Sequence, residues 1–218
     1  MKSKIILIIS IINFILTVAF TYTYDSSIIA IHYNANGAAD YWGPKWFILI
    51  FSALPLVLSL IYLIYSEINK SNENLQVNKH IEQKMITYII LWFITIEWIF
   101  ILTLNNPQNI IVYVSITVAV LFIVLGLDLP KLKRNKFLGI RTPWTLKSDI
   151  VWVKTHILSK KCMILSGIIV ALFSIVSMIL KLDILCIWGI FIAILLTFIL
   201  PFAYSYNIYK TIVDKSNE

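Results

Sequence analysis

The chain has 218 residues, of which 60% are hydrophobic and only 13% are charged, and its formal net charge is +7. This composition excludes a soluble domain, because a soluble domain could not remove so much apolar surface from water. A helix that spans a membrane needs about 20 mainly apolar residues. We therefore expect an all-α, polytopic membrane protein with six transmembrane helices, an ordered outer loop and an interfacial inner loop. The six predicted spans lie at about 5–23, 46–66, 85–104, 110–129, 162–180 and 184–204.

The first apolar segment follows Lys2 and Lys4, and in this respect it is similar to a secretory signal peptide. Its apolar stretch is longer than that of a typical signal peptide, and no convincing small-residue cleavage site follows it. We therefore expect this segment to be retained as the first transmembrane helix.

The outer loop between the first two spans, about residues 24–45, carries signals of ordered structure. Ile29, Ile31 and Tyr33 alternate with other residues, which predicts a short extended segment. Asn36-Gly37 is a typical turn pair, because both residues tolerate positive φ. The aromatic residues that follow are expected at the outer membrane interface, where amphipathic rings are favoured. These are Tyr41, Trp42 and Trp46.

The same outer loop gathers several polar side chains that are candidates for contact with a ligand. One His and one Asp are too few to predict a metal site. Hydrogen bonding within the loop and contact with a peptide are the two interpretations that remain open. The polar residues are His32, Asn34, Asn36 and Asp40.

The third predicted span contains Glu97, roughly a third of the way in from its outer end. A carboxylate in hydrocarbon is costly, so Glu97 must face the bundle interior or a cavity, or be protonated. No Lys or Arg lies at a similar depth, and we expect protonation, or hydrogen bonds to Asn13 or to Tyr or Thr side chains, rather than an ion pair. Two roles remain open for Glu97: a structural interhelical hydrogen bond, or a functional role as a proton relay or ligand anchor.

Asp128 lies near the inner end of the fourth span and is expected to interact with the basic inner loop.

The inner loop, about residues 130–161, mixes Trp, Pro, Arg and His in a way that a simple connector would not need. Pro130 ends the fourth span, and a new helix can begin with Thr145 or Ser148 as its N-cap. Apolar residues then recur at helical spacing between lysines, which predicts a helix lying in the membrane interface. Arg141 could bind a phosphate or a carboxylate bidentately. A connector anchored only by lipid is the alternative. The apolar residues are Leu146, Ile150, Val153 and Ile157.

The distribution of charge predicts how the chain is oriented. If the N-terminus is inside, Lys45 and Lys181 are the only outer residues among the 18 Lys and Arg. This asymmetry follows the positive-inside rule and predicts that both termini are cytoplasmic. The basic charge is then explained by topology and by attraction to anionic lipids, and we expect no direct binding of nucleic acid.

The sequence contains no arrangement typical of catalysis or of metal and cofactor binding. It has no HExxH motif and no glycine-rich phosphate loop. His32 and His156 are expected on opposite sides of the membrane and so cannot share a site. Cys162 and Cys186 belong to different spans, and we predict neither a disulfide nor a metal site there. We therefore expect a protein that is not an enzyme and needs no cofactor.

Two motifs, taken in this order, resemble a known family. The segment 135–149, followed by Trp152 and Lys154-Thr155-His156, resembles the signature of the SdpI family. The run 31–45 resembles a second module that is often found at the front of the same proteins. The domains expected from this resemblance are an N-terminal hairpin with the outer-loop module at 1–66, a polar cytoplasmic linker at 67–84 and a four-helix SdpI-like region at 85–218, with the basic motif loop at 130–161.

The SdpI family consists of multi-spanning immunity proteins against the bacterial SDP toxin, a secreted peptide. The resemblance therefore implies a bacterial membrane immunity protein whose outer loop faces the toxin. It also implies signalling, in which toxin binding lets the protein sequester a cytoplasmic repressor. A small proton-coupled transporter or exporter, motivated by Glu97, is the alternative function. The implied outer ligand-binding residues are His32, Asn34, Gly37, Asp40 and Trp42. The implied inner motif residues are Gly139, Arg141, Thr142, Pro143, Trp144, Trp152, Thr155 and His156.

Overall fold

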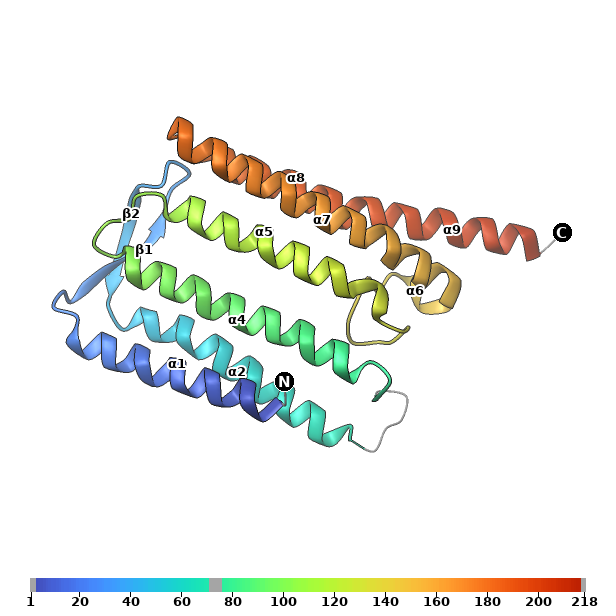
Figure 1. Cartoon of the computed structure of the whole chain (residues 1–218), viewed down its shortest axis with the longest axis horizontal. Helices are drawn as coiled ribbons and strands as arrows, with labels where there is room; N and C mark the ends of the chain where they lie inside the picture. The colour runs from blue at the N-terminus through green and yellow to red at the C-terminus, as the bar shows by residue number, and fades with distance from the viewer. Residues whose placement is uncertain (1–2, 71–75, 217–218) are drawn as a thin grey trace.

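Six long helices run side by side in the computed structural model, which describes residues 3–70 and 76–216 (Figure 1). All six are long and apolar enough to cross a membrane, so the prediction of an all-α polytopic membrane protein is confirmed. The first four are α1 (Ser3–Thr23), α2 (Phe47–Ile68), α4 (Lys79–Thr103) and α5 (Ile110–Asp128), and α5 continues as the 3-10 turn η1 (Leu129–Lys131). The last two are α7 (Asp149–Leu180) and a rod made of α8 (Ile184–Ile194), the π-helical turn η2 (Leu195–Ile199) and α9 (Leu200–Ser216).

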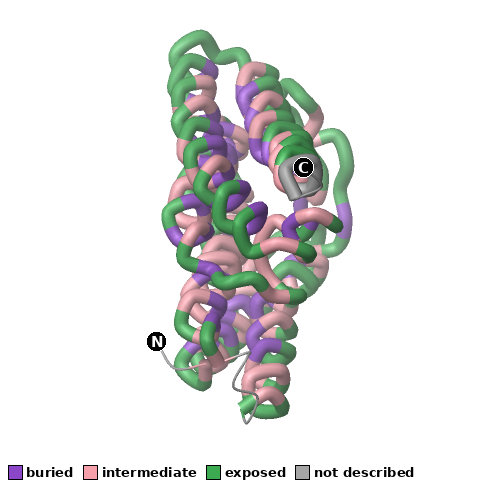
Figure 2. Tube along the Cα trace, turned by 90° about the vertical axis from the view of Figure 1, so that its right-hand side faces the viewer, coloured by how far each residue is buried: buried purple, intermediate pink, exposed green. Residues whose placement is uncertain are grey.

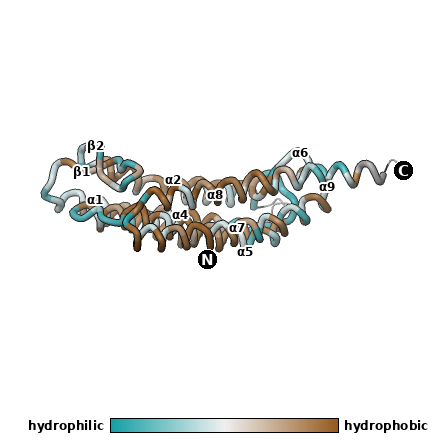
Figure 3. Tube along the Cα trace, turned by 90° about the horizontal axis from the view of Figure 1, so that it is seen from above, coloured by the Kyte–Doolittle hydropathy of each residue, from teal (hydrophilic) through white to brown (hydrophobic). Residues whose placement is uncertain are grey.

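Small and polar side chains line the interior of the bundle, whereas large apolar side chains face outward. Ser52, Ser115 and Ser174 are buried, while Ile15 and Ile61 are exposed. Figure 2 shows buried and exposed positions alternating along the helices. Figure 3 shows a hydrophobic middle with more hydrophilic segments towards both ends. Small interior residues let helices approach closely, and an apolar exterior is what contact with lipid requires.

Helix α7 packs directly against α5 and α8, and also against η2 and α9. Its approach to α5 depends on Gly167, because a Cβ atom at this position would lie 2.6 Å from the carbonyl oxygen of Ala119. Ser166 then donates a hydrogen bond to the carbonyl oxygen of Ala193 at 3.2 Å. These two contacts fix the spacing of the middle of α7 from α5 and α8.

The outer loop folds as an antiparallel hairpin of β1 (Ile28–Tyr33) and β2 (Ala39–Pro44). The predicted extended segment and turn are confirmed, and Gly37 in the turn has a φ of +75°. Ile29 is buried in one apolar cluster with Ile48 of α2 and Ile101 of α4. This burial fixes the hairpin across one end of the bundle. Figure 1 shows that both ends of the described chain point away from the hairpin.

The helix predicted in the inner loop forms, but the expectation that it is separate from the fifth span is wrong. Helix α7 begins at Asp149 and runs unbroken into the fifth span. The residues between His156 and Cys162 include neither Pro nor Gly, and Ser159 is buried on the same face as both. The helical hydrogen bonds therefore continue through the polar segment. Ser148 caps the helix as predicted, because its hydroxyl accepts a bond from a backbone amide at 3.4 Å.

The helices also extend beyond their predicted spans at the inner end. Helix α4 begins at Lys79 rather than near residue 85, and α9 continues to Ser216 rather than ending near residue 204. Hydropathy finds only the apolar part of a helix, whereas backbone hydrogen bonding can continue through polar residues beyond it. The inner loop also contains the short helix α6 (Pro143–Lys147), which directly precedes α7.

Candidate functional site

The centre of the inner motif is a pair of stacked rings on the first turns of α7. Trp152 and His156 lie one helical turn apart, with their ring centroids 4.1 Å apart and their planes at 21°. Both are almost completely buried, at 1% and 0% exposure. The indole nitrogen of Trp152 donates a hydrogen bond to the carbonyl oxygen of Leu132 at 2.7 Å. The pair therefore ties the start of α7 to the chain that leaves η1.

His156 fastens the motif loop to this pair through both of its ring nitrogens. The backbone amide of Ile140 donates to Nε2 at 3.1 Å, and Nδ1 lies 2.8 Å from the carbonyl oxygen of Trp152. An amide can only donate and a carbonyl can only accept, so the proton is on Nδ1 and the ring is neutral. A second proton on Nε2 would break the bond to Ile140. His156 is thus a buried clamp rather than an exposed contact residue.

Gly139 makes this clamp possible because of its backbone conformation and its lack of a side chain. Its φ is +112°, a value that residues with a Cβ atom rarely adopt. A Cβ atom here would lie 2.5 Å from Nε2 of His156 and 3.1 Å from the Trp152 ring. The loop can therefore close over the two rings only with glycine at this position.

A capping box holds the next part of the motif. The Thr145 amide donates to the Thr142 hydroxyl at 3.1 Å, and the Thr142 amide donates to the Thr145 hydroxyl at 2.9 Å. Pro143 occupies the first turn of α6, where a missing N–H costs nothing. The Thr142 hydroxyl also lies 3.0 Å from that of Ser205, which connects the motif to α9. Thr155 on α7 is fully buried, and its hydroxyl has no hydrogen-bond partner within the described residues.

Arg141 and Trp144 occupy the accessible side of the motif. Trp144 packs on two rings of α9, with centroid distances of 5.2 Å to Phe202 and 5.0 Å to Tyr206. Arg141 is exposed, and it donates to the carbonyl oxygen of Lys136 at 2.6 Å. Residues Gly139–Pro143, together with Phe198, Ile199 and Phe202, line a groove of about 520 Å³, which we call the inner groove.

The prediction that Asp128 interacts with basic residues is confirmed. Its carboxylate is only 1% exposed and lies 2.5 Å from the Lys131 ammonium and 2.9 Å from that of Lys84. Tyr88 also donates to it at 3.2 Å. A buried carboxylate is stable only when it is paired and hydrogen-bonded, and this one is. The cluster joins the inner ends of α4 and α5 beneath the motif loop.

The outer residues divide into those that shape the hairpin and those that it exposes. Asn34 shapes the turn, because its side-chain oxygen accepts bonds from two backbone amides, at 2.9 and 3.1 Å. Gly37 lies at the tip. His32 and Asp40 come from opposite strands and interact at 2.5 Å, and their side chains are 65% and 43% exposed. Trp42 pairs with Ala30 across the hairpin and is 56% exposed.

The tip of the hairpin forms one wall of a groove at the outer end of the bundle. This groove, of about 510 Å³, is called here the outer groove. Lys181 and Asp183 give it one charge of each sign, and Gly37 lies against the Asp183 carboxylate. Neither residue could be recognised as part of a site from the sequence, because three separate loops meet here and no local pattern connects them. The lining residues are Asn36, Gly37, Ala38, Pro107, Gln108, Asn109, Met178, Lys181 and Asp183.

The predicted hydrogen bonds of Glu97 are confirmed. One carboxylate oxygen accepts from the Asn13 side-chain amide at 2.7 Å, and the other accepts from the Thr17 hydroxyl at 2.5 Å. Asn13 in turn accepts from the Trp98 indole at 2.8 Å and donates to the Ser52 hydroxyl at 3.3 Å. Glu97 is 2% exposed, so this network joins α1, α2 and α4 inside the bundle.

The described residues include no group of three or more His, Cys, Asp or Glu side chains that could hold a metal ion. Cys162 and Cys186 are both buried as free thiols. The two candidate sites are therefore characterised by grooves, exposed aromatic rings and charges.

Comparison with known proteins connects both ends of the chain to described families. Residues 131–205 match the SdpI/YfhL protein family, and residues 8–56 match a domain of unknown function, DUF1648. The chain is 27% identical over 176 residues to "Immunity protein SdpI" of Bacillus subtilis (strain 168). The matched residues cover 80% of this chain and 82% of that protein. No solved structure matches the chain. The first region contains the inner motif and the second contains the hairpin.

Proposed function

We propose that this chain, whose predicted resemblance to the SdpI family is confirmed, is a membrane immunity protein that protects a bacterium from an extracellular SDP-type peptide toxin. The observation that carries the proposal is the relationship to an immunity protein over 80% of the chain and 82% of that relative. The role is non-catalytic: the protein binds rather than transforms its ligand.

In the proposed orientation of the protein in the membrane, the hairpin lies outside the cell and the motif loop lies inside. Both described ends of the chain point away from the hairpin, towards the motif end of the bundle (Figure 1). The Lys and Arg residues of the loops concentrate at the same end, as the positive-inside rule requires of the cytoplasmic side. In a bacterial cell membrane, both termini would then be cytoplasmic.

The outer groove is the proposed contact surface for the toxin. A peptide presents hydrogen-bonding backbone, apolar side chains and charges. The groove offers Lys181 and Asp183 for charges, and the adjacent hairpin offers the exposed ring of Trp42. Exposed Trp rings are frequent anchors of protein interfaces, because they bury a large apolar area with few rotatable bonds.

Helix α7 supports the finer proposal that toxin binding is signalled to the cytoplasm. The helix ends at Leu180, beside the outer groove residues Met178 and Lys181, and its first turns carry Trp152 and His156 of the inner motif. A shift of α7 at one end would therefore move the motif at the other. The inner groove, with exposed Arg141, is the proposed contact for an acidic segment of a cytoplasmic repressor.

Replacing Trp42 by Ala is expected to weaken binding of SDP-type peptide to the purified protein by at least about tenfold, because an interface Trp commonly contributes that much. Binding would be measured by titrating labelled peptide onto protein in lipid nanodiscs. Trp188→Ala is the matched control, because Trp188 is similarly exposed, at 54%, but lies on the apolar helix α8. Equal affinity of the native protein and the Trp42 variant would contradict the proposal that Trp42 contacts the toxin.

A further inference from the structure

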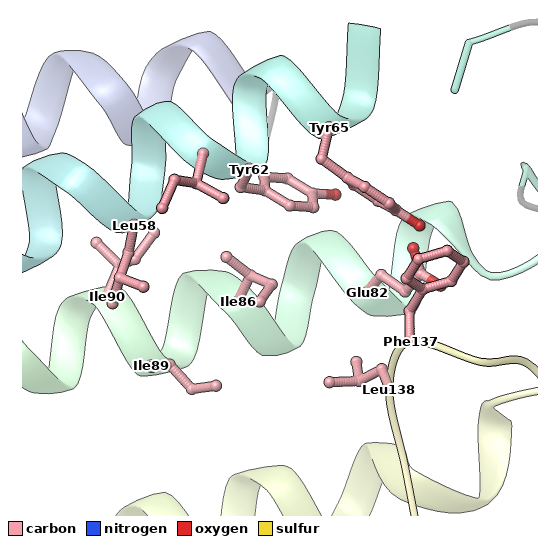
Figure 4. A pocket seen from close by; sticks show the side chains of 10 residues that line it. Leu58, Tyr62, Tyr65, Glu82, Ile86, Ile89, Ile90, Phe137 and Leu138 are labelled. Atoms are coloured by element: carbon pink, nitrogen blue, oxygen red, sulfur yellow. The ribbon is translucent and has the colours of Figure 1, made fainter. Parts of the chain in front are cut away.

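A recess opens at the inner end of the bundle between α2, α4 and the start of the motif loop (Figure 4). Its volume is about 320 Å³, and we call it the α2–α4 recess. It is separate from both grooves described above, and no part of the proposed immunity role uses it. It is lined by Leu58, Ile61, Tyr62, Tyr65, Glu82, Ile86, Ile89, Ile90, Phe137 and Leu138.

One end of the recess is polar and incompletely hydrogen-bonded. Glu82 is only 6% exposed, and its Oε1 atom has no hydrogen-bond partner within the described residues. The buried hydroxyl of Tyr65 also has no partner there. Figure 4 shows the Glu82 and Tyr65 side chains together at this end, with Phe137 beside them. A buried carboxylate oxygen without a donor is unfavourable, so this end is suited to a ligand that donates a hydrogen bond.

The remainder of the recess is apolar and extends away from this end. Ile86 and Ile90 lie one and two turns further along α4, and Leu58 lies one turn further into α2 than Tyr62 (Figure 4). Glu82 is in the first turn of α4, near the membrane interface, so the apolar wall continues towards the middle of the bilayer. This is the arrangement of a membrane lipid, which has its head at the interface and its acyl chain in the hydrocarbon.

The charged side chains around the polar end determine which lipid head group fits there. The Glu82 carboxylate would pair with an ammonium group that carries N–H donors. Lys79 lines a small adjoining recess with Tyr62 and Tyr65, where a lipid phosphate would find a cation. An anionic glycerol head can donate only from neutral hydroxyls and brings no cation to pair with the carboxylate, and a quaternary ammonium has no N–H to donate. A primary ammonium next to a phosphate satisfies both groups.

We infer that the α2–α4 recess binds one molecule of a zwitterionic aminophospholipid, with its ammonium group on Glu82 and an acyl chain along Ile86 and Ile90. The bound lipid also braces the motif loop, because Phe137 lines the recess and its ring lies 5.2 Å from that of Tyr65. Gly139 follows Phe137 by two residues, so the lipid and the buried clamp would stabilise the same loop.

The test is competitive lipid binding to the purified chain, read by native mass spectrometry. The protein would receive equal amounts of phosphatidylethanolamine, phosphatidylcholine and phosphatidylglycerol with identical acyl chains. We expect about tenfold preference for phosphatidylethanolamine, the size of one charge-assisted hydrogen bond, and we expect Glu82→Gln to abolish that preference. Glu67→Gln, which changes an exposed carboxylate at the same end, should keep it.

Ile86→Trp provides a second variant that fills the apolar part of the recess and leaves Glu82 in place. It should reduce the binding of all three lipids at the site while the lipid-free protein keeps its melting temperature. Equal binding of the three lipids to the native chain would overturn the inference, as would a preference that survives Glu82→Gln. Neither result depends on toxin, so the immunity role and the lipid site can fail independently.

Discussion

Replacing Trp152 by Ala is expected to lower the free energy of unfolding by about 3–5 kcal/mol, the usual cost of emptying a buried Trp site. Trp152 is 1% exposed, stacks on His156 and donates to the carbonyl oxygen of Leu132. The Ala variant would leave a cavity, an unpaired buried carbonyl and a histidine without its stacking partner. Thermal unfolding of the detergent-solubilised protein should show a fall in melting temperature of roughly 6–20 °C.

Trp188→Ala is the control for this prediction, because Trp188 lies on the outward face of α8 with 54% exposure. Its melting temperature should change little. Hydrogen exchange adds a local measurement: the Ile140 amide, which donates to His156, should lose protection in the Trp152 variant. Similar melting of both Trp variants, with the Ile140 amide still protected, would contradict the description of a buried clamp.

Replacing Glu97 by Leu is expected to destabilise the protein by roughly 2–4 kcal/mol, because the side chains of Asn13 and Thr17 lose their acceptors inside the bundle. Glu97→Gln keeps the shape and one acceptor oxygen, and it should cost less than about half of that. Chemical unfolding of both variants in the same detergent would measure the difference.

The same pair of variants separates a structural role of Glu97 from proton-coupled transport. Transport coupled to protons needs a group that titrates, and Gln does not titrate. If Glu97 is structural, cells that express Glu97→Gln at normal abundance should survive toxin as well as cells with the native chain. Lost protection in that variant, with toxin binding retained, would instead favour the transporter.

Elements that depend on local pattern were predictable from the sequence. The six spans followed from apolar length, and the hairpin followed from the alternation of Ile29, Ile31 and Tyr33 before a turn pair. The hydrogen-bond partners of Glu97 followed from depth, because Asn13 was a polar side chain in another span and no cation lay nearby. The spans and the contacts of Glu97 rest on constraints that the membrane imposes, whereas the hairpin rests on strand alternation and turn chemistry.

The length of α7 was not predictable from the same signals. The segment 149–161 is polar enough to end a hydropathy span, and its outward residues Ile150, Val153 and Ile157 fit an interfacial helix equally well. Its buried face was decisive, because Trp152 and His156 pack under the loop that precedes them. That packing is a tertiary property, and no spacing within the segment reveals it.

The ligand-facing surfaces were the least predictable part of the molecule. The outer groove brings together the hairpin tip, the loop after α4 and the turn before α8, so Lys181 and Asp183 became candidates only in three dimensions. Glu82 was equally unpredictable as a site residue. In the sequence it lies at the edge of a polar linker, where a carboxylate is common. Its burial beside Tyr65 depends on how α2 and α4 pack.

Survival of a toxin-sensitive bacterium that expresses this chain, challenged with SDP-type peptide, tests the proposed function most directly. We expect the native chain to protect, and we expect Arg141→Ala of equal abundance to fail, because Arg141 is the accessible cation of the inner groove. Protection by both chains would support the immunity role but contradict a role for Arg141 in its mechanism. Sensitivity of both strains, with the protein confirmed in the membrane, would contradict the immunity role itself.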